Sequence, residues 1–274
     1  MTSTGVKQET KELVRDNRGW VQALMSAGYA ARGAIYIIMG ILALQLALGR
    51  RKGETDQAGA LAEIGNKSFG KTLLIAMAVG FLAYALWHLL AAALNLQCED
   101  SKHRALRVIR FFLYSAFAWS TLQFALNAEQ QGGDKKSRDF TKRIFEWPAG
   151  RWLVAALGLV FLGMAAYSAR QASGDRYKQD LKTWEMSGRD HTIIETIARV
   201  GLYARMFVFG LIGLFLLQAA WTHDAKKAKG IDDSLRTVAQ APFGKVALGA
   251  LAIGLAAFGL YSLIEARYRK VMTC

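Results

Sequence analysis

Three arginine–glutamine pairs with a common spacing are the residues of this chain most suited to chemistry. In each pair an arginine lies at the entrance of an apolar stretch and a glutamine follows thirteen residues later: Arg32 with Gln45, Arg110 with Gln123, and Arg205 with Gln218. A guanidinium group near a membrane surface can hold an anion, such as a lipid phosphate or an anionic solute at a pore mouth. An amide at membrane depth needs a partner, so the glutamines indicate either bonds between helices or a polar passage.

Each of these residues also has a simpler interpretation, which the sequence alone favours. An arginine at a helix end places its charge among lipid headgroups and sets topology. A glutamine can join two helices at about 1–2 kcal/mol per bond or less. His88 is a secondary candidate, because it is the one histidine inside an apolar stretch. It has no acidic, histidine or cysteine companion at ligand spacing, which favours packing over proton transfer or metal and haem binding.

Six uncharged apolar stretches must position these residues. They cover residues 33–49, 72–98, 111–128, 152–169, 206–222 and 246–264. Each is close to the length of about 20 residues that crosses the roughly 30 Å hydrocarbon layer. Their uniform apolarity does not fit the alternating strands of a membrane barrel. The sequence therefore predicts an all-α integral membrane protein with six transmembrane helices.

The first and third pairs of helices repeat each other closely. Gly28–Arg32 (Gly-Tyr-Ala-Ala-Arg) aligns with Gly201–Arg205 (Gly-Leu-Tyr-Ala-Arg), and the same offset pairs Gly40 with Gly213. The middle copy is more divergent and has Ala118 at the position of that glycine. Because each unit crosses the membrane twice, we expect three parallel units around a pseudo-threefold axis, with a linear row as the alternative. Equivalent residues would then form one ring of arginines and a deeper ring of glutamines.

A glycine and a basic residue begin the second helix of each unit. These pairs are Gly70-Lys71, Gly150-Arg151 and Gly244-Lys245. A short segment with apolar residues at helical spacing precedes each pair: Leu61 with Ile64, Phe140 with Ile144, and Leu235 with Val238. We expect these three segments to form short helices that lie in the membrane interface.

The repeats divide the chain into six regions. These are a polar tail (1–22), repeat 1 (23–98), repeat 2 (99–170), an amphipathic connecting loop (171–198), repeat 3 (199–267) and a C-terminal tail (268–274). In the connecting loop, Tyr177, Leu181 and Trp184 fall on one helical face, which favours a helix on the membrane surface over one that docks a partner. The N-terminal tail lacks the apolar core of a cleavable signal peptide, so the first helix is expected to direct insertion.

The basic residues flank the apolar stretches, which favours lipid over nucleic acid as their partner. The net charge is +14, and Lys and Arg number 19 on the side that holds both termini against 16 on the opposite side. The positive-inside rule therefore favours cytoplasmic termini. Anionic membrane lipids are the expected partners, and the expected location is the inner (cytoplasmic) membrane.

The pattern resembles the bacterial membrane family known as domain of unknown function 1206. The resemblance covers about residues 25–267 and rests on the Gly-x-x-Ala-Arg start of the first and third units. In the middle unit, Leu106–Arg110 keeps only the arginine. The resemblance implies a pair of transmembrane helices that occurs three times in the chain, and it implies no activity.

No catalytic pattern accompanies the predicted helices. The sequence has no Gly-x-Ser-x-Gly, no His-Glu-x-x-His and no phosphate-binding glycine loop, and its carboxylates lie in loops and at helix ends. Cys98 and Cys274 are isolated and predict free thiols, with a disulfide as the alternative and no metal or cofactor. We expect a non-enzymatic protein that binds lipid or a small solute among its repeats, or conducts it passively. A structural or stress-related scaffold that acts through protein association is the second hypothesis, and an enzyme within the bilayer is the third.

Overall fold

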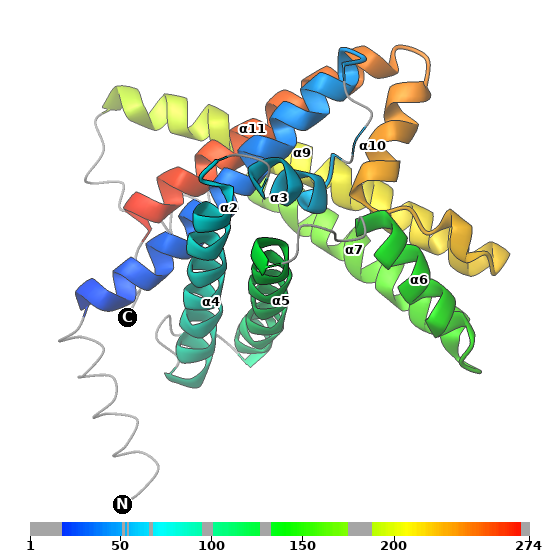
Figure 1. Ribbon diagram of the computed structural model, residues 1–274, viewed down its shortest axis with the longest axis horizontal. Coiled ribbons are helices and arrows are strands. Elements are labelled where there is room, and N and C mark those ends of the chain that lie inside the picture. Colours follow the sequence, from blue (N-terminus) through cyan, green and yellow to red (C-terminus); the bar gives the residue numbers. More distant parts are fainter. Residues whose placement is uncertain are drawn as a thin grey trace, which may run out of the picture.

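The computed structural model describes residues 18–50, 53, 55–65, 68–94, 101–126, 133–174 and 188–269, where every regular element is a helix (Figure 1). The long helices are α2 (Arg18–Ala47), α4 (Gly70–Leu94), α5 (Ser101–Leu126), α7 (Gly150–Ser173), α9 (Gly188–Thr222) and α11 (Gly244–Tyr268). The short ones are α3 (Gln57–Gly65), α6 (Gly133–Phe145), the 3-10 turn η2 (Ala225–Lys227) and α10 (Ile231–Gln240).

Some of the predictions fall outside the described residues. Most of both tails, the two cysteines and the centre of the connecting loop, with Tyr177, Leu181 and Trp184, belong to this group. The two ends of the predicted loop are helical, because α7 continues to Ser173 and α9 begins at Gly188.

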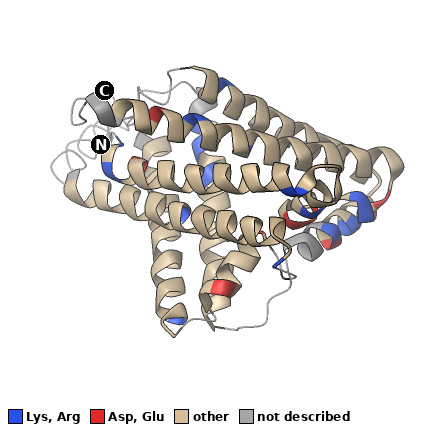
Figure 2. Cartoon of the chain, turned by 90° about the horizontal axis from the view of Figure 1, so that it is seen from above, with Lys and Arg blue, Asp and Glu red and all other residues tan. Residues whose placement is uncertain are grey.

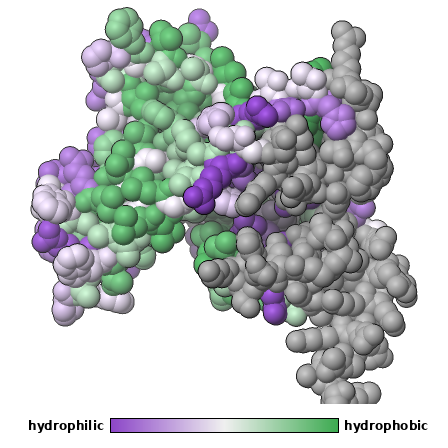
Figure 3. Space-filling view, turned by 180° about the vertical axis from the view of Figure 1, so that it is seen from behind, coloured by the Kyte–Doolittle hydropathy of each residue, from purple (hydrophilic) through white to green (hydrophobic). Residues whose placement is uncertain are grey.

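Five of the described helices are long and apolar enough to cross a membrane: α2, α4, α7, α9 and α11. The sequence predicts a sixth span at 111–128. Most of that stretch lies in α5, whose first turns carry Arg104, Arg107 and Arg110 and are therefore less apolar. Most charged residues lie toward the helix ends in the ribbon of Figure 2, and Figure 3 shows a broad apolar surface among fewer hydrophilic residues. Exposed apolar surface on this scale is typical of a protein surrounded by lipid.

The turn into the second long helix has the same geometry in all three repeats. The glycine that begins this helix lies against a carbonyl oxygen six residues earlier. A Cβ added to it would lie 2.1, 1.8 and 2.0 Å from that oxygen, for Gly70 with Ile64, Gly150 with Ile144, and Gly244 with Val238. Only glycine fits such a contact. The short helices α3, α6 and α10 precede these glycines and contain the apolar pairs from which the sequence predicts them.

The long helices form three antiparallel pairs, and each pair joins two different repeats. The most extensive packing is that of α2 along α11, of α9 along α7, and of α5 along α4, and the pairs run in different directions in Figure 1. The first helix of each repeat thus lies against the second helix of the repeat before it, and the first repeat lies against the last. Small buried residues occupy one equivalent position in every pair: Gly40 with Ala252, Gly213 with Gly158, and Ala118 with Ala78.

A second interface exists within repeats 1 and 3, and repeat 2 lacks it. α2 packs on α4, and α9 packs on α11, whereas α5 and α7 have no extensive contact in the described structure. A Cβ added at Gly28 would lie 2.0 Å from the Cβ of Tyr84, and one at Gly201 would lie 2.5 Å from the backbone of Phe258. The Gly-x-x-Ala-Arg start therefore permits the closest approach within a repeat. Leu106 stands at this position in the middle repeat and is too large for the same contact.

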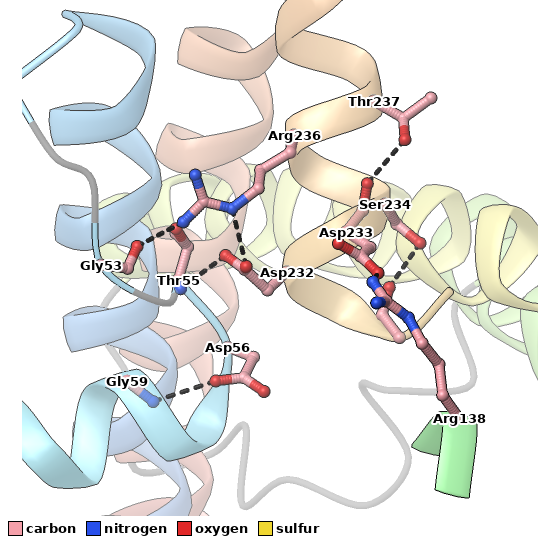
Figure 4. A network of polar contacts seen from close by, with 11 residues as sticks. Gly53, Thr55, Asp56, Gly59, Arg138, Asp232, Asp233, Ser234, Arg236 and Thr237 are labelled. Atoms are coloured by element: carbon pink, nitrogen blue, oxygen red, sulfur yellow. Dashed lines mark hydrogen bonds and ion pairs between the residues drawn. The ribbon is translucent and has the colours of Figure 1, made fainter. Parts of the chain in front are cut away.

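A polar network joins α10 to α6 and to the residues before α3 (Figure 4). Asp232 of α10 accepts hydrogen bonds from the backbone N–H of Thr55 (2.8 Å) and from Nε of Arg236 (2.7 Å). Arg138 of α6 forms an ion pair with the neighbouring Asp233. Residues before α3 therefore touch α10, which places equivalent parts of repeats 1 and 3 on the same side.

Replacing Asp232 with alanine should weaken this network measurably. The Thr55 amide would lose its acceptor in a buried site, and an unsatisfied buried group costs about 1–3 kcal/mol. The free energy of unfolding of the full chain in detergent should fall by that amount. Asp224→Ala is the matched control, since Asp224 accepts from the Lys226 amide at an exposed position. Equal losses in the two variants would contradict a special role for Asp232.

Candidate functional site

Arg32 lies inside the bundle, where α2 packs on α11. Its Nε donates a hydrogen bond to Ser262 Oγ (3.1 Å), and its guanidinium group forms an ion pair with Glu265. Glu265 is 4% exposed, and its second carboxylate oxygen is paired with Arg269. The guanidinium carbon also lies 4.5 Å from the ring centroid of Tyr29. Arg32 therefore has a carboxylate partner within the protein.

Arg205 approaches Arg32 through a shared aromatic ring. The ring centroid of Phe258 lies 5.4 Å from the guanidinium carbon of Arg32 and 5.1 Å from that of Arg205. Phe209 provides a second ring, 4.9 Å from Arg205. The rings offset part of the charge, by about 0.5–2 kcal/mol each. The buried Nε of Arg205 nevertheless has no hydrogen-bond partner among the described residues.

Arg110 lies on α5 and is half-buried. On α4, the position equivalent to Ser262 holds the buried His88. The His88 ring packs edge-on against Tyr84 at 4.5 Å and stacks on Tyr114 at 6.0 Å. Neither of its nitrogens has a hydrogen-bond partner in the described part of the chain. His88 is therefore a packed ring with unused polar atoms, on the helix that pairs with α5.

The positions equivalent to the two partners of Arg32 differ in charge between the repeats. One position on the second helix of the preceding repeat is a buried polar residue in every case: Ser262 for Arg32, His88 for Arg110, and Ser168 for Arg205. The next position, three residues later, holds Glu265, Ala91 and Gln171 in the same order. Only the first arginine therefore meets a carboxylate at this position, although all three recur at one place in the repeat.

The three glutamines do not share this interior with the arginines. Gln45 and Gln218 are exposed, and Gln123 is half-buried. Gln45 lines a mainly apolar groove of about 310 Å³ between α2, α3 and α4. Thirteen residues at about 100° each place a glutamine roughly 140° around the helix from its arginine. Arg32 therefore lies against protein, whereas Gln45 and Gln218 are on the exposed side of their helices.

Sequence reasoning missed an aromatic residue four positions after each arginine. Each of these rings packs against the second helix of the preceding repeat. The ring centroids are 4.7, 4.5 and 5.9 Å apart, for Tyr36 with Phe258, Tyr114 with Tyr84, and Phe209 with Phe161. Because residues four apart share a helix face, the recurring Arg-x-x-x-aromatic spacing was the signal that could have identified them.

The arrangement can hold an anion. Arg110 and Arg205 have no carboxylate partner among the described residues. Arginine presents a planar set of N–H donors that matches the oxygens of a phosphate or carboxylate. In the described ranges no group of three His, Cys, Asp or Glu residues could hold a metal ion.

Comparisons with known proteins agree with this threefold organisation. The family described as Domain of Unknown Function (DUF1206) matches residues 27–95, 107–174 and 200–269. The chain is also 29% identical over 271 residues to "Uncharacterized protein YxxB" of Bacillus subtilis (strain 168), a match that covers 97% of this chain and 95% of that protein. No solved structure matches the chain. Because its model matches three segments that follow the two long helices of repeats 1, 2 and 3, the chain belongs to the DUF1206 family.

Proposed function

We propose that this protein is a non-enzymatic, multi-pass membrane protein that binds anionic phospholipid through the arginines of its repeats. The observation that carries the proposal is the unequal neutralisation of three equivalent arginines. Arg32 is paired with Glu265, whereas Ala91 and Gln171 stand at the corresponding positions for Arg110 and Arg205.

The energetics of a charge at membrane depth support an anionic ligand. An uncompensated arginine at the centre of a membrane helix costs about 2.5–3.5 kcal/mol on insertion scales. The repeat relieves this cost internally at Arg32, and an external phosphate would relieve it at the other two positions. Hydrogen bonds to charged groups contribute about 1.5–3 kcal/mol each, which is enough to select a lipid by its headgroup.

Peripheral apolar grooves favour lipid over a solute that crosses the protein. One groove is the 310 Å³ cavity beside Gln45, and a second of about 350 Å³ lies between α4 and α5. Arg104 lines the second groove and donates from Nε to the Ala92 carbonyl oxygen (2.9 Å). Both grooves combine an apolar lining with few polar groups, as an acyl chain beneath a headgroup requires.

The proposal includes the topology in which these sites would operate. We take α5 as the sixth span, because it packs antiparallel along α4 over much of its length. The cyclic pairing of each first helix with the preceding second helix fits pseudo-threefold packing, with α5 and α7 left apart. The excess of Lys and Arg on the terminus side favours cytoplasmic termini in the inner membrane.

Arg110→Gln combined with Arg205→Gln should weaken binding of phosphatidylglycerol by about tenfold or more, the equivalent of about 1.4 kcal/mol. Native mass spectrometry of the full chain in detergent, titrated with phosphatidylglycerol or phosphatidylcholine, measures this directly. Arg170→Gln is the matched control, since Arg170 is exposed at the end of α7. Equal retention of both lipids by the wild-type chain, or an unchanged double variant, would overturn the proposal.

A further inference from the structure

We propose that the space between α5 and α7 is an anionic-phospholipid site, open sideways to the membrane and centred on Arg110. The inference rests on the proposed function and adds the place and the route of entry. It starts from the interface that repeats 1 and 3 possess and repeat 2 lacks.

The residues that form this interface are small or aromatic in repeats 1 and 3 and bulky aliphatic in repeat 2. On the first helix, the glycines and alanines that permit close packing are Gly28, Gly201, Ala31 and Ala204. Leu106 and Ile109 replace them on α5. On the second helix, the corresponding residues are Gly80, Gly254, Tyr84 and Phe258. Val160 and Met164 replace them on α7. In repeat 2, both α5 and α7 therefore carry larger aliphatic side chains where repeats 1 and 3 have glycine or alanine at the contact positions. These side chains keep the two helices apart.

Positions that are buried in repeats 1 and 3 are exposed on α5 and α7, because these two helices do not pack together. Leu113 is 48% exposed, whereas its equivalents Ile35 and Val208 are 3% and 4% exposed. On α7, Val160 is 56% exposed, and its equivalent Gly254 lies against Ala204. An apolar face on each helix is therefore available to acyl chains.

Arg110 lies within this face of α5. Leu106, Leu113 and Phe117 stand four residues before it and three and seven residues after it, which places all four on one side of the helix. All three apolar neighbours are exposed. A charge surrounded by apolar surface at membrane depth is costly unless an anion accompanies it. A phosphate at Arg110 would supply that anion while the acyl chains cover the leucines.

The charge of the surroundings favours a phospholipid over a second copy of this chain. The chain carries a net charge of +14, so a second copy would add positive charge to the site. The facing end of α7 offers neutral hydrogen-bonding groups instead: Gln171 Nε2 donates to the Tyr167 hydroxyl at an exposed position (3.4 Å). Both groups lie in the last turns of α7 and could bond to a lipid headgroup.

Site-specific quenching by brominated lipid tests this placement. A fluorophore is attached to Leu113→Cys in the full chain carrying Cys98→Ser and Cys274→Ser, reconstituted in bilayers. Brominated phosphatidylglycerol should quench it at least twofold more strongly than brominated phosphatidylcholine at equal mole fraction. Arg110→Gln should abolish that preference. Leu214→Cys, on an exposed apolar position of α9, is the control and should show no preference.

Each other outcome overturns the inference. Equal quenching by both lipids at Leu113 would mean that the face is ordinary lipid-exposed surface. Absence of quenching by either lipid would mean that protein, such as a second copy, covers it. If phosphatidylglycerol is still retained in native mass spectrometry in either case, the proposed function survives and only this site fails.

Discussion

Glu265→Gln is expected to lower the free energy of unfolding by about 3–5 kcal/mol, the cost of breaking a buried ion pair. The substitution keeps the shape of the side chain but removes the negative charge shared by Arg32 and Arg269. Two guanidinium groups would then remain in a protein interior without a carboxylate. Denaturant unfolding of the full chain in detergent measures the loss.

Two further variants identify the cause of that loss. Glu195→Gln removes a carboxylate from a partly exposed pair with Arg199 on α9, where about 0.3–0.5 kcal/mol is expected. Adding Arg32→Gln to Glu265→Gln should recover part of the stability, because the unpaired charge is removed with its partner. A loss at Glu265 no larger than that at Glu195 would show that this ion pair does not hold α2 to α11.

Gly201→Leu is expected to destabilise the protein by about 3 kcal/mol or more, at or above the upper end of the usual cost of overpacking. A Cβ at this position would lie 2.5 Å from the backbone of Phe258, so α9 and α11 would have to separate. The same residue type stands naturally at position 106 of the middle repeat, where the two helices are already apart. The variant would thus separate α9 from α11, as α5 is separated from α7 in the second repeat.

Gly210→Leu is the matched control on the same helix. No atom lies within 4 Å of a Cβ added there. Replacing glycine with leucine, which has a higher helix propensity, contributes up to about 1 kcal/mol of stability. Thermal unfolding in detergent should therefore separate the two variants clearly. Similar midpoints for both would indicate that α9 and α11 do not pack through the Gly-x-x-Ala-Arg segment.

Local signals in the sequence were enough to predict the repeat and its helices. The glycine that begins each second helix and the apolar spacing before it are properties of a few adjacent residues, and α3, α6 and α10 stand where these residues predict. The family resemblance was confirmed, because the three matched segments follow the three repeats. The helix at the sixth predicted span, α5, is less apolar than the other long helices, since three arginines lie in its first ten residues.

Contacts between distant residues could not be read from one sequence. The ion pair of Arg32 and Glu265 joins positions 233 residues apart, and nothing in the pattern linked them. The different faces of the arginines and glutamines could have been worked out from the sequence, because thirteen residues correspond to a rotation of roughly 140° around a helix. Ala118 was noted only as a departure from glycine. It is nevertheless a small buried residue at the position where Gly40 and Gly213 lie in the other two helix pairs.

Disulfide cross-linking in bilayers tests the arrangement of the repeats most directly. In the chain without native cysteines, Ala78→Cys with Ala118→Cys should cross-link α4 to α5 upon oxidation, and Ala204→Cys with Gly254→Cys should cross-link α9 to α11. Ile109→Cys with Val160→Cys occupies the positions equivalent to the second pair in the middle repeat and should remain uncrosslinked. Efficient cross-linking of Ile109→Cys with Val160→Cys, together with its loss from Ala78→Cys with Ala118→Cys, would contradict the account.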